Sequence, residues 1–302
     1  MYLKAYYNIK HLIPRRLQLA LRRLRARVKL RTHADVWPIE EKTAVPPKNW
    51  PGWPDGKKFA FILTHDVDTA KGQERCRDLA DLERRLGFIA SYNFVPERYQ
   101  VSEELRNYLT ENGFEVGVHG LNHDGKYYNS RAIFQERALK INRYIREWGS
   151  VGFRSPSMLH NLEWLHDLDI KYDSSTFDID PFEPQSDGVG TIFPFHVPSE
   201  KGGKGYVEIP YTMPQDFTLF ILMKHKDIDI WKRKLDWIAS KGGMVLMLVH
   251  PDYINFNKSL LLEEEYYVDK YVEILEYVNR MYKNQYYHVL PRELAIFWGN
   301  NY

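Results

Sequence analysis

Two carboxylates close the first strongly apolar run of the chain. The sequence Thr-His-Asp-Val-Asp occupies residues 64–68 and directly follows Phe-Ala-Phe-Ile-Leu at residues 59–63. Carboxylates near an apolar interior are costly unless something pairs with them, and a metal ion is one such partner. Asp66 and Asp68 are two residues apart, so in extended backbone both side chains face the same side of the strand. Aspartates that cap a loop are the alternative explanation of this pair.

A pair of histidines follows another apolar run. His119 and His123, in the sequence His-Gly-Leu-Asn-His, are four residues apart. On a helical turn this spacing brings both imidazoles to one face, as a divalent ion requires, although the spacing alone is also frequent by chance. Together with an aspartate from a neighbouring strand, the histidines would form a His-His-carboxylate site with positions open for water and substrate.

Such a site needs a scaffold that joins distant segments, and the hydrophobic pattern from Phe59 onward supplies one. Short apolar runs alternate with helical patterns, which indicates a parallel sheet with crossover helices. The predicted strands are residues 59–64, 89–95, 114–119, 151–155, 170–175, 206–210 and 244–250. The predicted helices are residues 73–86, 102–112, 130–148, 161–168, 227–241 and 262–282. This number of units favours a closed barrel, in which chemistry gathers at the C-terminal ends of the strands.

Polar residues lie at the C-terminal ends of several of the predicted strands. They are Asp66, Asp68, His119, His123, Arg154, Asp173 and His250. If the strands close into a barrel, we expect these side chains to converge at one mouth.

The ordered set of motifs resembles the polysaccharide deacetylase superfamily (NodB-like, carbohydrate esterase family 4), with a D-x-D form of the first motif. The motifs are Thr-His-Asp-Val-Asp, His-Gly-Leu-Asn-His, Phe-Arg-Ser-Pro-Ser, Tyr-Asp-Ser-Ser and Leu-Val-His, in this order, within residues 59–255. The resemblance implies a distorted (β/α)7 barrel that removes N-acetyl groups from a sugar or glycan precursor. It also implies one divalent metal ion, with zinc as the first choice and cobalt, nickel or manganese as alternatives.

The resemblance assigns roles to the residues that match each motif. Asp66 matches the catalytic base, and Arg154 matches the residue that orients this base and keeps it ionised. Asp68, His119 and His123 match the metal ligands.

The last motifs supply the acid and the oxyanion donor. His250 matches the general acid, and the backbone N–H of Ser157 matches the donor to the oxyanion. The acidic partner of His250 is less sharply defined, because Asp173, Asp178 and Asp180 could each match it. Asp173 is the preferred assignment.

The chain departs from the family's pattern at three positions. Val67 separates two aspartates that are adjacent in the common form, and this D-x-D version resembles the branch that acts on lipid-linked aminoarabinose and some peptidoglycan. Gly120 replaces the usual Ser or Thr and removes one hydroxyl near the metal. Ser157 stands where tyrosine is frequent. His65 is expected to face away from the site as a core histidine.

The first residues differ in charge from the rest of the chain. Ten of the 42 Lys and Arg residues, and none of the 40 Asp and Glu residues, lie within residues 1–31. The spacing of Leu17, Leu21, Leu24 and Val28 predicts a basic amphipathic helix over residues 14–31. This helix either docks on the more acidic remainder of the protein or lies on an anionic membrane surface. Nucleic-acid binding is not expected, since nothing else resembles a binding module.

The remaining features define the domains and the compartment. Residues 32–58 are rich in Pro and Trp and are predicted to be an extended linker, pinned by its tryptophans to a barrel domain of residues 59–302. The single cysteine, Cys76, excludes an internal disulfide framework. Without a secretory or bilayer-spanning apolar run, we expect a cytoplasmic protein, peripheral at most on the inner membrane surface.

Two other functions remain open at this point. The same site could serve an O-acetyl esterase, a deformylase or another amidase, because the central chemistry is shared. A function of another class is a non-catalytic module that binds carbohydrate or membrane on a retired enzyme fold. Every expected catalytic residue type is present, which argues against the retired fold.

Overall fold

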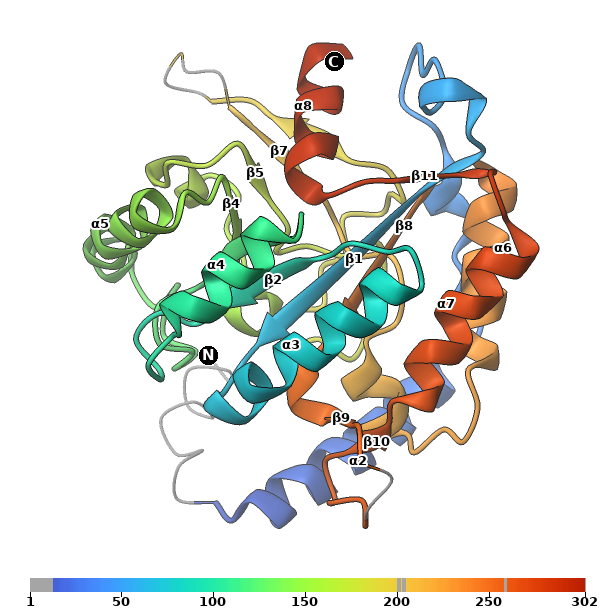
Figure 1. The fold of residues 1–302 in the computed structure, drawn as a ribbon, viewed down its shortest axis with the longest axis horizontal. Helices are drawn as coiled ribbons and strands as arrows, with labels where there is room; N and C mark the ends of the chain where they lie inside the picture. Colours follow the sequence, from blue (N-terminus) through green and yellow to red (C-terminus); the bar gives the residue numbers. More distant parts are fainter. Residues whose placement is uncertain (1–12, 200–201, 203–204, 258–259, 302) are drawn as a thin grey trace.

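Nine strands curl into one sheet within the described part of the chain, which comprises residues 13–199, 202, 205–257 and 260–301 of the computed structural model (Figure 1). These strands are β1 (Phe59–Val67), β2 (Ser91–Phe94), β3 (Glu115–His119), β4 (Gly152–Arg154), β5 (Tyr172–Asp173), β6 (Phe195–Val197), β7 (Tyr206–Glu208), β8 (Met244–Val249) and β11 (Tyr286–His288). A separate two-stranded sheet pairs β9 (Ile254–Asn255) with β10 (Tyr266–Tyr267).

The sheet closes on itself around β1. Parallel pairing runs from β1 through β2, β3, β4 and β5 to β7, and β6 pairs antiparallel at the edge. On its other side β1 pairs with β8. The first residues of β1 pair with β11 on the side opposite β8. Beyond β7, the backbone N–H groups of Thr212 and Met213 donate to the carbonyl of Leu246 in β8, at 3.3 and 3.2 Å, which joins the two ends. The prediction of a distorted (β/α)7 barrel is confirmed.

Helices surround the barrel (Figure 1). Their bounds are α2 (Arg15–Thr32), α3 (Ala70–Arg85), α4 (Glu103–Glu111), α5 (Arg131–Trp148), α6 (Asp229–Lys241), α7 (Asp269–Met281) and α8 (Pro291–Asn301). Helices α6 and α7 lie side by side on one flank, and α5 lies on the opposite flank. The Thr69 hydroxyl caps α3 by accepting from the N–H of Gly72. Because this cap residue directly follows Asp68, it sets the path of the chain where the first motif ends.

The apolar pattern of the central strands explains why they lie inside. All residues of β1 and β8 are buried, including the runs Phe-Ala-Phe-Ile-Leu and Met-Val-Leu-Met-Leu-Val. Strands buried on both faces show continuous apolar runs, without polar alternation, because helices cover one face and the barrel interior the other. The first motif is consequently held by a strand that is buried along its whole length.

The predicted elements are present with shifted ends, with two exceptions. Residues 161–168 form no α-helix, and their helical content is the 3₁₀ turn Trp164–Asp167. The helix predicted for residues 262–282 begins only at Asp269, since β10 occupies part of the segment. The sequence analysis also missed helix α8 and the short strands β6, β9, β10 and β11. Strands β6 and β11 are only partly buried and therefore lack a clear apolar pattern.

The Trp-rich segment before the barrel packs against it. Trp37 is buried and its ring lies 5.0 Å from that of Phe182, edge to face. The indole N–H of Trp53 donates to the carbonyl of Gly242 at 2.8 Å, and the Trp50 ring lies 4.7 Å from that of Trp53. These rings hold residues 32–58 against the barrel, as the sequence predicted. This segment therefore joins α2 to the barrel through defined contacts.

His65 faces away from the carboxylates of its own motif, as predicted. Its Nε2 lies 2.6 Å from Glu83 of α3, and its Nδ1 lies 3.1 Å from the carbonyl of Val249. The Glu83 carboxylate also accepts from the hydroxyls of Tyr92 and Tyr271, at 2.8 and 2.5 Å. One fully buried carboxylate therefore ties together β1, β2, α3 and α7.

Glu83→Ala is expected to lower the free energy of unfolding by about 3–5 kcal/mol, because three buried donors lose their acceptor. Denaturant unfolding followed by circular dichroism measures this loss. Glu104→Ala is the matched control, since Glu104 pairs with Arg77 at 3.0 Å on an exposed surface. An exposed pair contributes about 0–1 kcal/mol. Equal unfolding midpoints for the two variants would contradict the assigned structural role of Glu83.

Candidate active site

Strand ends bring the predicted site residues to one mouth of the barrel. Asp66 is the penultimate residue of β1, and Asp68 follows that strand directly. His119 ends β3, Arg154 ends β4, and His250 follows β8. Because these strands are parallel neighbours around the barrel, their C-terminal ends meet at one edge, and the expected convergence is observed.

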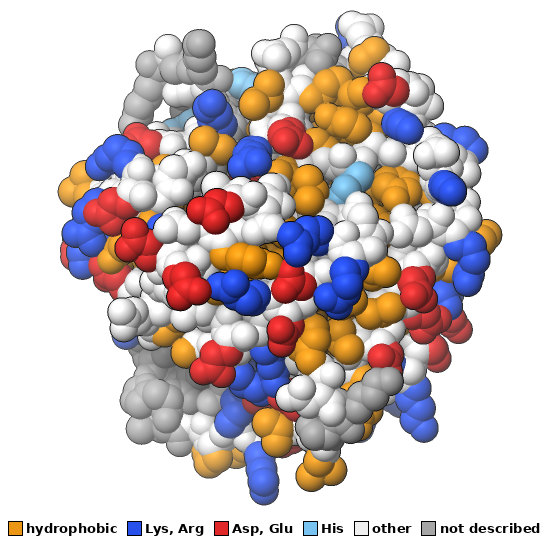
Figure 2. Space-filling view, in the orientation of Figure 1, with side chains coloured by type: hydrophobic (Ala, Val, Ile, Leu, Met, Phe, Trp, Pro, Cys, Tyr) orange, Lys and Arg blue, Asp and Glu red, His pale blue; other side chains and the backbone are white. Residues whose placement is uncertain are grey.

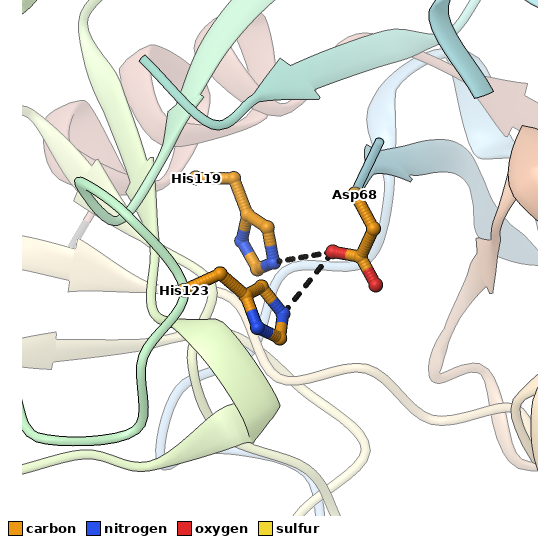
Figure 3. A group of neighbouring side chains, drawn as sticks. All are labelled: Asp68, His119 and His123. Carbon is orange, nitrogen blue, oxygen red and sulfur yellow. Dashed lines mark ion pairs between the residues drawn. The ribbon is translucent and has the colours of Figure 1, made fainter. Parts of the chain in front are cut away.

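Asp68, His119 and His123 form a group that could hold a metal ion (Figure 3). Asp68 Oδ1 lies 3.1 Å from Nε2 of His123 and 3.5 Å from Nε2 of His119. Ligands bound to one tetrahedral zinc ion lie about 3.4 Å apart, given metal–ligand bonds of about 2.0–2.1 Å. The separations therefore fit a shared cation.

The hydrogen-bonding state of these atoms also fits a metal. His119 Nδ1 lies 3.1 Å from the carbonyl oxygen of Arg154, which only accepts, so Nδ1 carries the proton and Nε2 offers a lone pair. Asp68 Oδ1 is buried and has no hydrogen-bond donor among the described residues. Although burial opposes ionisation of Asp68, the positive charge of His123 and His119 in their protonated forms lowers the pKa of Asp68 well below its usual range. One carboxylate oxygen and two imidazole nitrogens suit zinc as well as cobalt, nickel or manganese.

A loop, and not the predicted helical turn, brings the two histidines together. The strand ends at His119, and Gly120 and His123 both have left-handed backbone, with φ of 62° and 56°. A Cβ on Gly120 would lie 2.4 Å from Cγ of Pro156, so this position admits only glycine. The close packing explains why Gly120 stands where Ser or Thr is usual. His123 adopts a conformation that is uncommon for a non-glycine residue and recurs at functional sites.

Asp66 lies directly beside the Asp68-His119-His123 group. Its Oδ2 is 3.6 Å from Nε2 of His119, while its Oδ1 faces two donors. These donors are Nη1 of Arg154, at 3.4 Å, and Nδ2 of Asn93, at 3.2 Å. One oxygen of Asp66 is thus held by donors, and the other points toward the candidate metal group.

Arg154 is itself fixed by a buried network. Its Nε donates to the carbonyl of Ser174 at 2.8 Å, and its Nη2 donates to the Ser174 hydroxyl at 2.7 Å. Its Nη1 also donates to the hydroxyl of Thr64 at 2.9 Å. Because the guanidinium is almost fully buried and has defined partners, it can orient Asp66 without occupying the open side of the site.

Asp216, and not Asp173, is the carboxylate partner of His250. Asp216 Oδ1 lies 2.7 Å from His250 Nδ1, and Asp216 Oδ2 accepts from the backbone N–H of His250 at 2.9 Å and from the Tyr266 hydroxyl at 3.1 Å. Burial opposes protonation of His250, but the Asp216 carboxylate outweighs it and raises the pKa of the imidazole to about 10. His250 is therefore a cation at neutral pH, with its Nε2 proton available for donation.

The three aspartates that the sequence offered as partners of His250 are engaged elsewhere. Asp173, Asp178 and Asp180 have short contacts, of 2.7, 2.6 and 2.9 Å, with Ser175, Lys234 and Tyr211, respectively. Burial raises the pKa of Asp173. The assignment of Asp173 as the partner of His250 is wrong. The partner, Asp216, lies in the segment after β7, and this segment has no strand pattern that would have pointed to it.

Ser157 lies in the turn directly after β4. Its φ of 57° and that of Met158, 51°, place both residues in the left-handed region. The preceding Pro156 packs against Gly120, so the turn lies against the loop that carries the two histidines. This places the Ser157 backbone at the same mouth as the candidate metal group.

The structure adds three residues that the sequence analysis missed: Asn93, Asp216 and Asp252. The Asn93 side chain fits beside Asp66 because residue 117 is a glycine. A Cβ on Gly117 would lie only 2.0 Å from Oδ1 of Asn93. Asp252 accepts the backbone N–H of Asp68 at 2.9 Å, and burial, assisted by the Asp68 charge, raises the pKa of Asp252 to about 6. Only Asp252, two residues after His250, carried a signal in the sequence, as a carboxylate beside the last motif.

Comparisons with known proteins agree on the fold. No family model matches the chain, and no curated protein matches it. A protein from Pseudomonas aeruginosa PAO1 assigned as a polysaccharide deacetylase has a TM-score of 0.65 at 15% identity, over 88% of this chain and 99% of that one. An allantoinase, Puue, has a TM-score of 0.64 at 15% identity, over 88% and 98%. A Mycobacterium smegmatis protein assigned as a polysaccharide deacetylase has a TM-score of 0.61 at 16% identity, over 84% and 94%.

At such identities, structural likeness establishes the fold and leaves the activity to the site. The motif-based resemblance to the polysaccharide deacetylases is thus confirmed for the architecture, and this chain has the polysaccharide deacetylase fold.

Proposed function

We propose that the chain is a metal-dependent hydrolase that removes N-acetyl groups from a sugar or glycan precursor. The observation that carries the proposal is the group of Asp68, His119 and His123, which lies beside a carboxylate held by Arg154. A protonated histidine at the same mouth supplies the acid that amide hydrolysis needs. The fold shared with proteins assigned as polysaccharide deacetylases supports the same activity.

Asp66 is the base in this proposal. A divalent ion held by the three ligands would polarise the acetyl carbonyl and make water more acidic. Asp66 takes a proton from the attacking water through Oδ2. Its other oxygen, Oδ1, faces Arg154, whereas Oδ2 faces the candidate metal group. Arg154 and Asn93 orient the carboxylate through its other oxygen, Oδ1. The carboxylate of Asp66 is therefore oriented before the substrate binds.

Ser157 and His250 complete the proposed reaction. The backbone N–H of Ser157 donates to the carbonyl oxygen as negative charge develops on it. The departing nitrogen must be protonated, because an amide anion is a very poor leaving group. His250 gives it the Nε2 proton, and Asp216 stabilises the imidazolium until that transfer.

Loss of the metal is expected to abolish acetate release. Treatment with a chelator should remove activity on a panel of N-acetylated sugars, and added zinc should restore it. His119→Ala should lower both metal content and acetate release, because one of three ligands is missing. His196→Ala, an exposed histidine on β6, is the matched control and should retain both. Acetate release that survives complete metal removal would contradict the proposal.

A second candidate is hydrolysis of a different bond at the same site. One of the similar structures is named an allantoinase and not a polysaccharide deacetylase. An O-acetyl ester, a formamide or an amide outside a sugar would use the same base, metal ligands and acid. Measuring acetate, formate and ammonia from a matched panel of substrates distinguishes these bonds.

A further inference from the structure

Helix α2 packs on the barrel through only one of its faces. Leu19 and Ala26 are buried against the core. Arg23 donates to the carbonyl of Ile221 at 3.2 Å and pairs with Glu263 at 2.8 Å. The helix therefore docks on the rest of the protein, one of the two arrangements that its sequence allowed, but through a face of mixed character.

The apolar face of α2 points away from the protein. Leu17, Leu21, Leu24 and Val28 are 51, 52, 59 and 55% exposed, respectively. At about 100° per residue, the four form one stripe on the side opposite Leu19 and Ala26. A row of leucines left in water is unfavourable, and a contiguous exposed apolar stripe marks an interaction site.

A second segment adds apolar side chains beside α2. Leu260 and Leu262 are 89 and 58% exposed, and they precede Glu263 and Glu264. Arg23 pairs with Glu263, and Arg15 pairs with Glu264, so this loop is fastened to α2 (Figure 1). We call these six residues the apolar surface: Leu17, Leu21, Leu24, Val28, Leu260 and Leu262. Two segments far apart in the sequence thus expose leucines in one region of the molecule.

Cations flank this apolar surface. Helix α2 contains Arg15, Arg16, Arg22, Arg23, Arg25, Arg27, Lys29 and Arg31 and no acidic residue. Within residues 13–199, 202, 205–257 and 260–301, no ion pair involves Arg16, Arg25, Arg27 or Arg31, which are exposed. Figure 2 shows hydrophobic and basic side chains close together along the lower edge, where α2 lies.

We propose that α2 and the Leu260–Leu262 loop dock the protein onto the surface of an anionic lipid membrane. A helix with leucines in its exposed stripe and arginines on both sides suits the boundary between acyl chains and negatively charged headgroups. Nucleic acid would engage the arginines and leave the leucines in water. A second copy of this chain would bring two sets of unpaired arginines together. No described helix is both long and apolar enough to cross a bilayer.

A series of ring contacts connects the inner side of α2 with the candidate active site. The Arg22 guanidinium lies 4.4 Å from the centre of the Phe217 ring. That ring is 5.2 Å from the Tyr253 ring, which is in turn 5.2 Å from His250. A membrane beneath α2 would therefore lie near the mouth at which His250 acts. The docking itself does not depend on the proposed hydrolysis.

Vesicle flotation of the full chain tests the proposal. We expect the wild-type protein to float with phosphatidylcholine vesicles that contain phosphatidylglycerol, on the order of tenfold or more over pure phosphatidylcholine. The double variant Leu21→Glu, Leu24→Glu should lose this binding, and Arg25→Gln with Arg27→Gln should weaken it. Leu139→Glu is the matched control, because Leu139 is also an exposed leucine, at 75%, and lies on the distant helix α5.

Circular dichroism confirms that each variant is folded, and acetate release from a soluble substrate tests hydrolysis separately. No flotation of the wild type with anionic vesicles would overturn the proposal, as would unchanged flotation of the Leu21→Glu, Leu24→Glu variant. A lipid-free dimer that this variant abolishes would instead assign the apolar surface to a second copy. Oligonucleotide binding that depends on Arg25 and Arg27 but survives the leucine changes would likewise overturn the lipid assignment.

Discussion

Asp66→Asn is expected to lower kcat by about 10²–10⁴-fold while metal content stays at the wild-type level. The amide keeps the size of the carboxylate but cannot accept the proton of the attacking water. The candidate metal ligands remain, since Asp66 is outside the Asp68-His119-His123 group. Acetate release measures the rate, and elemental analysis of the purified variant measures the metal.

Asp35→Asn is the control for the loss of one carboxylate, because Asp35 is exposed and lies outside the barrel, in the segment after α2. It should leave both readouts unchanged. Turnover of the Asp66 variant close to wild type, with its metal in place, would remove Asp66 from the role of base. Loss of metal in that variant would instead show that Asp66 is itself a ligand.

The pH dependence of the reaction is expected to depend on His250 and Asp216. The folded protein raises the pKa of His250 from 6.5 to about 10, so the acid stays protonated through neutral pH. Activity should therefore fall on the alkaline side, at a pH above 6.5, the ordinary pKa of an imidazole. His250→Ala should lower kcat by about 10²–10⁴-fold, because the leaving nitrogen loses its proton donor.

Asp216→Asn separates positioning from proton donation. Removing the charge lowers the pKa of His250, so the alkaline limb of the kcat profile should move to lower pH. The Asp216 contribution belongs to the protein and persists when a cation offsets the charges of Asp66 and Asp68. An unshifted limb in a folded Asp216→Asn variant would contradict the assignment of His250 as the group that titrates there.

The ion pair of His250 and Asp216 also makes the stability of the folded state depend on pH. Because folding raises the pKa of His250, the pair stabilises the folded state fully below about pH 6.5, the ordinary value of the imidazole. This contribution declines as pH rises and is lost above about 10. The free energy of unfolding of Asp216→Asn should consequently be less sensitive to pH over this interval.

Much of the barrel and of the candidate metal site could be predicted because each depends on local patterns. The buried runs that become β1 and β8 are continuous in the sequence, and parallel strands place their C-terminal ends together. This geometry follows from chain direction, without knowledge of side-chain packing. It sufficed to bring Asp68 to His119 and His123.

The partners of these residues could not be predicted in the same way. Asp216 reaches His250 from a segment without periodicity, and Asn93 reaches Asp66 across neighbouring strands. Both contacts depend on the three-dimensional path of the backbone and on room left by other residues. Asp173 had the more regular position in the sequence, yet it lies against Ser175 and Glu208.

The amino-acid sequence by itself determined which residues end the strands and which part of the chain is basic. The leucine spacing in α2 likewise determined that this helix has an apolar face. Only the tertiary structure decided which face the helix buries, and it buries Leu19 and Ala26 while exposing Leu21 and Leu24. Periodicity specifies that side chains share a face, but the direction of that face depends on competing contacts with the rest of the molecule.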